Sequence, residues 1–438
     1  MKRLSLLLLT VLFVSFASAQ KIKNSYIGND GFSIKTQGFM GFYIDQSQNL
    51  LNIHPAAPTG LNLGVEFQSY QQYPWLQYHN NPTYGFGLSY IDFGAPEVMG
   101  HALAFYPYVN LNVVRLKHFE TKIKLATGVG VVSRHWYSHP EDIHPEDYNH
   151  PANNTTFSTY LNVYLSAGLN LNFPITRNFA FNTEFGFFHM SNGKTSVPNR
   201  GINTFYGGVG FITSVNPEEE VEPIQFPDLP YRWSLNFTGS AGKMHLDRED
   251  KHKFLIATFH AGAVYNVNNW YAVGPGVDVF FNDNVNVNSK NGFYCTKKLD
   301  GSEMEYTFTD KLRVGISVNN EFQFGRITAM LDWGIYVVNP SRNYYQSYNG
   351  GEVYKEVKRP VIYKCKDVGV DDGWNYIRFG AKFRVWDNLY IQALAKNHLH
   401  ICEYIEFGVG YTIPFISKSK RHDNKMIFHN RKNWWKNY

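Results

Sequence analysis

The chain has 438 residues, of which 18% are charged and 17% are aromatic, and it contains 36 glycines. Its formal net charge of +5 is concentrated after Phe415, where seven Lys and Arg residues outnumber one Asp, leaving a net charge of −1 for the rest. Such a basic patch suits anionic lipid headgroups better than nucleic acid. Because no run of about 18 apolar residues follows Gln20, a helical membrane protein is excluded.

The chain begins with MKRLSLLLLTVLFVSFASAQ, which has the pattern of a secretory signal peptide. Lys2 and Arg3 precede an apolar run at 4–16, and the small residues ASA predict cleavage after Ala19, so residues 1–19 would be removed. No cysteine stands at the cleavage position, so a lipoprotein is not expected. A secreted chain with many glycines, aromatic residues and alternating apolar positions is typical of a β-barrel in the bacterial outer membrane.

Segments of about ten alternating residues recur along the chain and predict strands. In the first half they lie near 32–44, 60–70, 83–93, 98–115, 119–136, 157–173, 178–191 and 201–214. In the second half they lie near 232–243, 253–267, 269–281, 308–323, 325–338, 374–386, 388–399 and 402–415. Between the two sets, the acidic stretch NPEEEVEPIQFPDLPY at 216–231 contains four prolines and predicts a linker.

The lengths of the connections agree with barrel topology, in which turns at one end are short and loops at the other are long. RLKHF, FPITRN, NVNN, FGR and VWDN are short even-numbered connections, whereas QQYPWLQYHNNPT is even-numbered but long. Both halves end alike, in GGVGFITSV and EFGVGYTIPF, which indicates diverged copies. We therefore expect an all-β chain of two tandem eight-stranded antiparallel barrels, at 20–215 and 232–415, followed by a basic tail at 416–438. One barrel of about 16 strands is the alternative.

The stretch EFGFFHMSNGKTSVPNRGINTFYGGVGF, residues 184–211, places polar side chains on an apolar strand face. Because successive strand side chains alternate, His189 and Ser191 share the face of Phe185 and Phe187, and Asn203 occupies the apolar face of the next strand. In a membrane barrel this face meets lipid, where polar groups are costly and usually functional. Residues i and i+2 lie about 6.5–7 Å apart and project in parallel. An imidazole can then take the proton of a hydroxyl and make the serine a nucleophile.

The string HMSNGKTSVPNRGIN, residues 189–203, resembles the motif of the outer-membrane lipid A 3-O-deacylases, the PagL family, and of related acyloxyacyl hydrolases. The family pattern is His-x-Ser-Asn, a short loop, Pro-Asn-x-Gly-Ile and then an acid, and the resemblance covers roughly residues 25–215. It implies an eight-stranded barrel with a lipid-facing site that removes an ester-linked acyl chain from the lipid A part of lipopolysaccharide, without a cofactor or metal. By this resemblance Ser191 is the nucleophile, His189 is the general base, and Asn192 with the N–H of Gly193 stabilises the oxyanion.

The acid position of the family is occupied by Asn203 in this chain. Its side-chain carbonyl can hold the histidine ring but cannot stabilise an imidazolium as a carboxylate would. Glu184 is the nearest acid, and strand alternation points its side chain into the barrel unless a bulge reverses it. The alternative is therefore a non-catalytic barrel, either a small pore or a surface-binding protein.

The second half lacks the proposed catalytic pair, because His189 and Ser191 correspond there to Leu399 and Ile401. The alternation instead predicts an interior face comprising Tyr390, Gln392, Lys396, His398 and His400, and it places Glu403 at the acid position. We expect this half to be a structural or binding barrel.

Four other features remain open. The loop HPEDIHPEDYNHP, residues 139–151, could bind a divalent cation, but its irregular spacing favours a solvated loop. Cys295 and Cys365 could form a disulfide, which would leave Cys402 over. The basic tail, which ends in NWWKNY, could lie at the membrane interface. Asn154 begins an Asn-Thr-Thr sequence, a glycosylation acceptor that means little in a bacterial protein.

Overall fold

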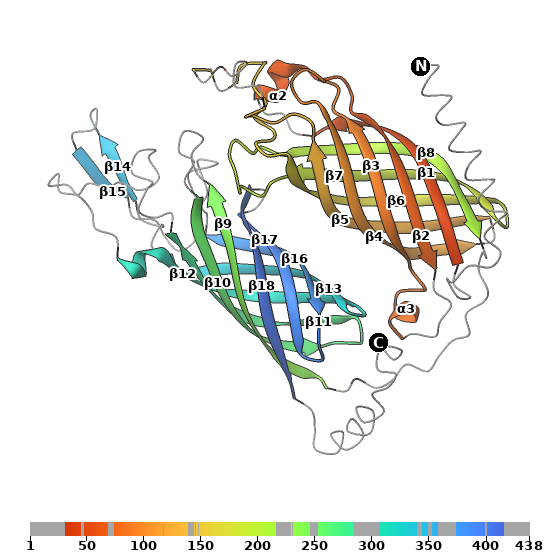
Figure 1. Cartoon of the computed structure of the whole chain (residues 1–438). Coiled ribbons are helices and arrows are strands. Elements are labelled where there is room, and N and C mark those ends of the chain that lie inside the picture. The colour runs from red at the N-terminus through yellow and green to blue at the C-terminus, as the bar shows by residue number, and fades with distance from the viewer. Residues whose placement is uncertain are drawn as a thin grey trace. The chain divides into compact units, whose positions relative to one another are not determined.

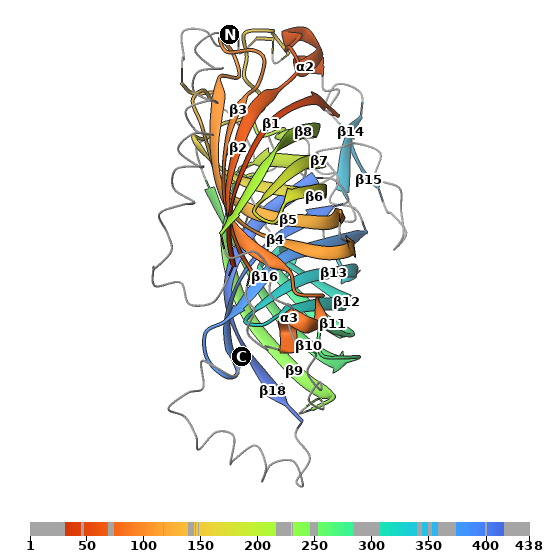
Figure 2. The same ribbon diagram turned by 90° about the vertical axis from the view of Figure 1, so that its right-hand side faces the viewer.

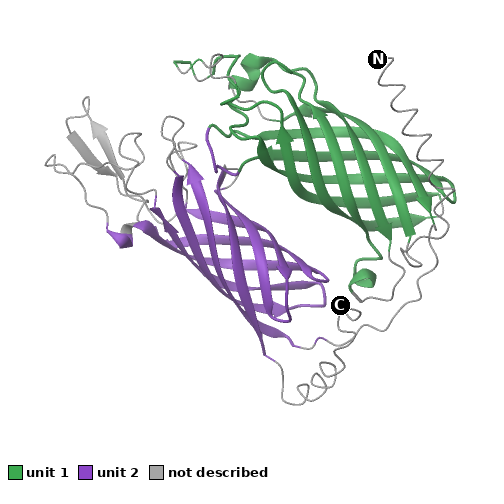
Figure 3. Cartoon of the chain, in the orientation of Figure 1, with its two compact units in different colours: residues 1–192, 198–226 green, residues 193–197, 227–438 purple. Residues whose placement is uncertain are grey.

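The computed structural model describes residues 31–44, 48–68, 74–116, 118–138, 144, 146–147, 149–215, 229, 231–245, 253–283, 307–339, 344–348, 353–357, 374–398 and 401–415. The predicted signal peptide, most of the predicted linker, the basic tail and Cys295 and Cys365 lie outside these residues. The chain divides into two compact units, Met1–Asn192 with Pro198–Phe226 and Gly193–Val197 with Pro227–Tyr438 (Figure 3). No helix in the described ranges is long and apolar enough to cross a membrane.

The first unit contains a closed antiparallel barrel in which each strand pairs with its neighbours in sequence and β1 pairs with β8 (Figure 1 and Figure 2). Its strands are β1 (Gly31–Tyr43), β2 (Thr59–Gln68), β3 (Thr83–Asp92), β4 (His101–Leu116), β5 (Phe119–Val132), β6 (Leu161–Thr176), β7 (Phe179–Ser191) and β8 (Ile202–Val215). Two short helices lie in its connections, α2 (Gln48–Ile53) after β1 and α3 (Pro74–Tyr78) after β2.

The alternation of side chains along each strand builds the wall of this barrel. On β4, Ala104 and Tyr106 are 0% and 2% exposed inside the barrel, whereas Leu103 and Phe105 are 49% and 51% exposed outside it. An apolar outer face over a closed sheet is the arrangement that a membrane-spanning barrel requires, because all backbone groups are paired and the outer side chains match the lipid.

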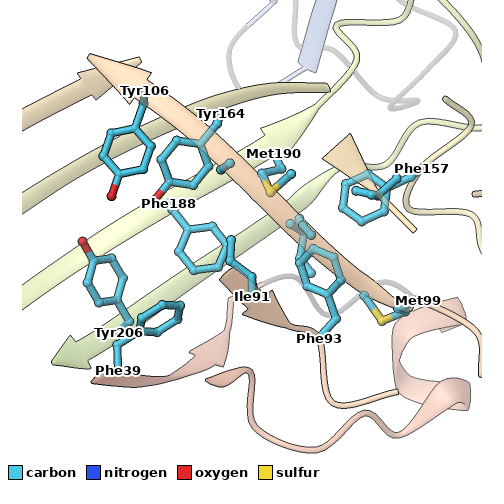
Figure 4. Close-up of a cluster of buried hydrophobic side chains, with 14 of the residues drawn as sticks. Phe39, Ile91, Phe93, Met99, Tyr106, Phe157, Tyr164, Phe188, Met190 and Tyr206 are labelled. Carbon is cyan, nitrogen blue, oxygen red and sulfur yellow. The ribbon is translucent and has the colours of Figure 1, made fainter. Parts of the chain in front are cut away.

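The interior of the first barrel is filled by an aromatic layer and a charged layer. In the aromatic layer, Phe39, Tyr164, Phe188 and Tyr206 pack together (Figure 4). In the charged layer, Glu184 accepts hydrogen bonds from Lys35 at 2.7 Å and from Tyr206, and it forms a second ion pair with Lys124. The buried carboxylate is therefore compensated by two cations, as a charge in a barrel interior must be.

The connections of the first barrel differ between its two ends. The turn between β4 and β5 and the turn between β6 and β7 each contain two residues, whereas the β5–β6 connection at the opposite end runs from 133 to 160. Short turns are typical of the periplasmic end and long loops of the cell-exterior end. The end of β7 and the start of β8 therefore lie at the exterior rim.

The second unit contains another closed antiparallel barrel, in the order β10-β11-β12-β13-β16-β17-β18-β9. Its strands are β9 (Trp233–His245), β10 (Lys253–Asn266), β11 (Tyr271–Asn282), β12 (Leu312–Phe324), β13 (Ile327–Val338), β16 (Asn375–Arg384), β17 (Leu389–His398) and β18 (Ile401–Pro414), and a 3-10 helix, η3 (Phe308–Lys311), precedes β12. Arg378 lies inside, 1% exposed, and donates to Asp278 and Glu406 at 2.6 Å each.

The prediction of two eight-stranded barrels is confirmed, and the single barrel of about 16 strands is wrong. Two details of the sequence reading are also wrong. A separate hairpin, β14 (Tyr344–Tyr348) with β15 (Val353–Val357), lies within the stretch expected to be a loop. The sixth strand is expected from 157 but begins at Leu161, because Phe157 turns into the interior instead, where it contacts Phe93.

Candidate active site

Strands β7 and β8 bring His189, Ser191 and Asn203 together. His189 is the direct cross-strand partner of Asn203, and Ser191 lies two residues further along β7. The Nε2 atom of His189 is 2.8 Å from Ser191 Oγ, and its Nδ1 atom is 2.8 Å from Asn203 Oδ1. One imidazole therefore connects a hydroxyl on one side with an amide carbonyl on the other.

The three side chains lie on the outer face of the barrel wall. Phe188 and Met190, which alternate with His189 and Ser191, are 1% and 0% exposed and point into the interior (Figure 4). On the outer face of β8, Phe205 follows Asn203 by two residues and is 47% exposed. Because side chains alternate along a strand, the inward packing of Phe188 and Met190 places the three polar side chains on the lipid side.

The hydrogen bonds fix the tautomer of His189. Because Asn203 presents a carbonyl oxygen to Nδ1, the ring carries its proton on Nδ1 and donates it to Asn203. The Nε2 atom is then an acceptor for the Ser191 hydroxyl. This is the arrangement that a general base next to a nucleophilic serine requires.

Asn192, the first residue after β7, makes hydrogen bonds through both its backbone and its side chain. Its backbone N–H donates to Asn199 Oδ1 at 3.0 Å, and its side-chain Nδ2 donates to Ser158 Oγ at 2.9 Å. Gly193 follows with a φ of 61°, a conformation that glycine adopts without strain. Since the N–H of Asn192 is already paired, the backbone donor available next in the chain is that of Gly193.

Gly201, just before β8, sits against the site. Its φ is 69°, and a Cβ atom added there would lie 3.1 Å from His189 Cε1 and 3.0 Å from Ser191 Cβ. A side chain there would therefore require His189 or Ser191 to shift by a few tenths of an ångström, in a backbone conformation that favours glycine.

Two of these residues were not singled out from the sequence. Asn199 lies within the Pro-Asn-x-Gly-Ile part of the quoted string, so the motif itself was a signal for it. Ser158 lies 34 residues before its partner, in a long loop without periodicity, and no sequence pattern indicated it.

Glu184 takes no part in this arrangement. It is 0% exposed inside the barrel, and no register shift separates it from His189 in the β7–β8 pairing. The inward parity expected for it is confirmed, and the residue beside His189 Nδ1 is Asn203.

The corresponding strands of the second barrel point their polar groups inward, as expected for Tyr390, Gln392, Lys396 and His398. Glu403 accepts from His398 Nε2 at 2.8 Å and from Lys396 at 2.5 Å, and it pairs with Arg313 at 3.1 Å. Leu399 and His400 lie outside the described residues. Glu403 is therefore the carboxylate of an ion cluster in the barrel interior.

The histidine-rich loop shows no clear ligand set in the part that the structure describes. His144 contacts Glu146 at 3.1 Å, and its ring lies against that of His150 at an interplanar angle of 33°, while His139, Glu141 and Asp142 lie outside the described residues. Among described residues, no group of three or more His, Cys, Asp or Glu side chains is arranged to hold a metal ion.

Comparison with known proteins gives matches to two protein families and to solved barrels. The family model described as lipid A 3-O-deacylase (PagL) matches residues 59–211, and the model described as acyloxyacyl hydrolase, C-terminal domain, matches residues 232–350. No curated protein matches.

Among solved structures, one described as the outer membrane enzyme PagL is 16% identical, with 41% of this chain and 98% of that chain covered and a TM-score of 0.27. Neisserial surface protein A is 6% identical, with 43% and 97% covered and a TM-score of 0.26, and the NanC porin is 7% identical, with 87% and 100% covered and a TM-score of 0.14. At these scores the structural neighbours support no inference about function.

The first match covers β2 to β7 and most of β8, including the complete His189–Asn203 stretch, and the second covers β9 to β14. The chain is accordingly an outer-membrane protein of two β-barrels, of which the first is similar to the lipid A 3-O-deacylase (PagL) family and the second to the acyloxyacyl hydrolase C-terminal domain.

Proposed function

We propose that the first barrel is a serine esterase that removes an ester-linked acyl chain from the lipid A part of lipopolysaccharide. The observation that carries this proposal is the chain of hydrogen bonds from Ser191 through His189 to Asn203 on the lipid side of the wall. Polar side chains that face lipid carry an energetic cost, and their presence there therefore points to a function.

The reaction follows from the proton positions. His189 Nε2 accepts the Ser191 proton while Oγ attacks the ester carbonyl carbon, giving a tetrahedral intermediate. When the ester bond breaks, His189 returns this proton to the leaving alcohol oxygen of the lipid A sugar, and the acyl group stays on Ser191. Water, activated in the same way, then releases the fatty acid and restores the hydroxyl.

The negative charge of the intermediate requires donors beside the serine. Asn192 and the N–H of Gly193 follow Ser191 directly and are our candidates for the oxyanion hole. Removing one such donor typically lowers kcat by about 10²–10³.

The surroundings suit a substrate that stays in the membrane. Leu165 is the cross-strand neighbour of His189 on β6, Val163 is that of Ser191, and Phe187 lies on the same outer face. A substrate at this rim would keep its acyl chain in hydrocarbon while its sugar remains at the exterior interface, so that the ester reaches Ser191 without leaving the bilayer.

The test is mass spectrometry of lipid A from cells that express the wild type or Ser191→Ala. We expect loss of an acyl chain with the wild type only. Ser214→Ala, a serine that pairs with Ser33 at the opposite end of the barrel, is the matched control and should retain activity. Identical lipid A profiles for the wild type and Ser191→Ala, with both proteins folded in the outer membrane, would rule out this function.

The second candidate function is a non-catalytic surface barrel, and the neutral amide of Asn203 favours it, because an amide does not stabilise an imidazolium as a carboxylate does. It predicts that the folded wild type hydrolyses neither lipid A nor a generic acyl ester. The small pore considered with it is disfavoured by the aromatic layer that Phe39, Phe188 and Tyr206 pack across the interior.

A further inference from the structure

Residues 154–158, the sequence Asn-Thr-Thr-Phe-Ser, form a buried segment in the β5–β6 connection, and we name it the support segment. Its five side chains are between 0% and 6% exposed, although four of them are polar. Polar groups are buried in this way only when hydrogen bonds compensate them.

Asn154 closes and anchors this segment. Its Oδ1 atom accepts from the N–H groups of Thr156 and Phe157 at 3.2 and 3.3 Å, which makes a local turn. Its Nδ2 atom donates to the carbonyls of Val98 and Arg134, at 3.0 and 3.2 Å. One side chain thus ties the support segment to the β3–β4 connection and to the start of its own β5–β6 connection.

Two further contacts hold the segment in place. Thr155 Oγ1 donates to Asn49 Oδ1 of α2 at 2.6 Å. Phe157 is 0% exposed and points into the aromatic interior, where its ring centroid is 5.4 Å from that of Phe93 (Figure 4). The segment is therefore fixed both to α2 and to the aromatic interior of the barrel.

The support segment in turn holds the loop that carries the site. The carbonyls of Thr155 and Thr156 accept from the N–H groups of Arg200 and Gly201, at 3.1 Å each. Ser158 Oγ accepts from Asn192 Nδ2 at 2.9 Å. The segment thus contacts the loop at both of its ends, next to Ser191 and next to β8.

We propose that the support segment positions the oxyanion side of the site, with Ser158 as the positioning residue that holds the amide of Asn192 in its donor orientation. This inference rests on the proposed esterase function for its catalytic consequence. Without Ser158 the Asn192 amide can rotate, and a rotated amide presents its oxygen, which repels an oxyanion instead of stabilising it.

The kinetic test measures ester hydrolysis by the full chain in detergent micelles. We expect Ser158→Ala to lower kcat about threefold to tenfold, as loss of one hydrogen bond does, with KM unchanged. Ser158→Thr keeps the hydroxyl and should restore kcat. Ser138→Ala, which removes a hydroxyl that accepts from the N–H of His135 in the same connection, is the matched control and should not change kcat.

A double mutant separates positioning from general damage to the loop. Asn192→Ala alone should lower kcat strongly, and adding Ser158→Ala should lower it no further, because Ser158 acts through Asn192. Additive losses, or a Ser158→Ala enzyme with wild-type kcat, would overturn the inference and leave the proposed esterase function intact.

A spectroscopic measurement tests the contact independently of activity. In NMR spectra of asparagine-labelled protein in micelles, we expect Ser158→Ala to shift the side-chain amide signal of Asn192 and Ser158→Thr to preserve it. A signal that does not change in Ser158→Ala refutes the contact. A folded wild type without hydrolysis refutes the esterase function instead, and this spectrum alone then decides whether Ser158 holds Asn192.

Discussion

Replacing Asn203 tests the chemistry of the site most directly, because this residue occupies the acid position. Asn203→Asp is isosteric and keeps an acceptor 2.8 Å from His189 Nδ1. A carboxylate has only acceptor atoms, whereas an amide can also turn its NH₂ group toward the ring and impose the tautomer that cannot accept the serine proton. The carboxylate also stabilises the imidazolium that forms when Ser191 is deprotonated.

The expected change in kcat follows from the one hydrogen bond that changes, between His189 Nδ1 and residue 203. A hydrogen bond between neutral groups contributes about 0.5–1.5 kcal/mol, and one to a charged group contributes about 1.5–3 kcal/mol. A gain of about 1–1.5 kcal/mol in the transition state raises kcat about fivefold to tenfold. Asn203→Leu removes the acceptor at similar volume and should lower kcat about twofold to tenfold by the same reasoning.

The assay is the initial rate of hydrolysis of an acyl ester by the three proteins in micelles, at equal concentrations of folded barrel. We expect Asn203→Leu to be the slowest, the wild type to be intermediate and Asn203→Asp to be the fastest. Equal rates in all three would refute the assignment of Asn203 as the partner of His189. A rate for Asn203→Leu above that of the wild type would show that the amide holds the ring in an unproductive orientation.

The other predictions concern the close approach at the site, the interior ion cluster and the exterior loop. Gly201→Ala should lower kcat at least tenfold without unfolding the barrel, because its Cβ would press on His189 Cε1; near-normal hydrolysis would contradict this. Glu184→Leu leaves two buried lysines unpaired and should lower the free energy of unfolding by about 3–5 kcal/mol in urea titrations, whereas Glu97→Gln, at an exposed ion pair, should change it by about 0–1 kcal/mol. Burial lowers the pKa of His135 from its ordinary 6.5. Its NMR titration should have a midpoint below that value, so the folded loop is favoured above pH 6.5 and weakened as the pH falls through the lower pKa.

The strands and their faces could be predicted from the sequence because a period of two is a local property. The positions of Phe185 and Phe187 place His189 and Ser191 outside, and the structure agrees. The direct pairing of His189 with Asn203 is different, because ten residues separate β7 from β8. A loop of that length does not set the register of a hairpin as a two-residue turn does.

The support segment could not be predicted, because its partners depend on how four connections meet at one rim. The sequence Asn-Thr-Thr-Phe-Ser shows no alternation of apolar and polar residues. Its apolar residue, Phe157, is the position at which the sequence predicts the start of the sixth strand. Phe157 instead fills the interior, and Asn154 satisfies the backbone that the turn leaves unpaired. In this region the competition between a strand and a buried turn is decided by tertiary contacts.

The two barrels show how the side of the wall decides what a polar pair can do. Near the end of its seventh strand the first barrel has His189 outside, bonded to a serine and an amide that face lipid. The matching end of β17 in the second barrel has His398, which faces inward and bonds to Glu403 among Lys396 and a buried arginine. A shift of one residue exchanges the faces of a strand, so the same scaffold supports a polar group open to lipid in one copy and an ion cluster sealed from it in the other. The first barrel has Asn203 at the acid position, whereas the second barrel has the carboxylate of Glu403. Glu403 lies inside the barrel, however, where an ester in the membrane cannot reach it.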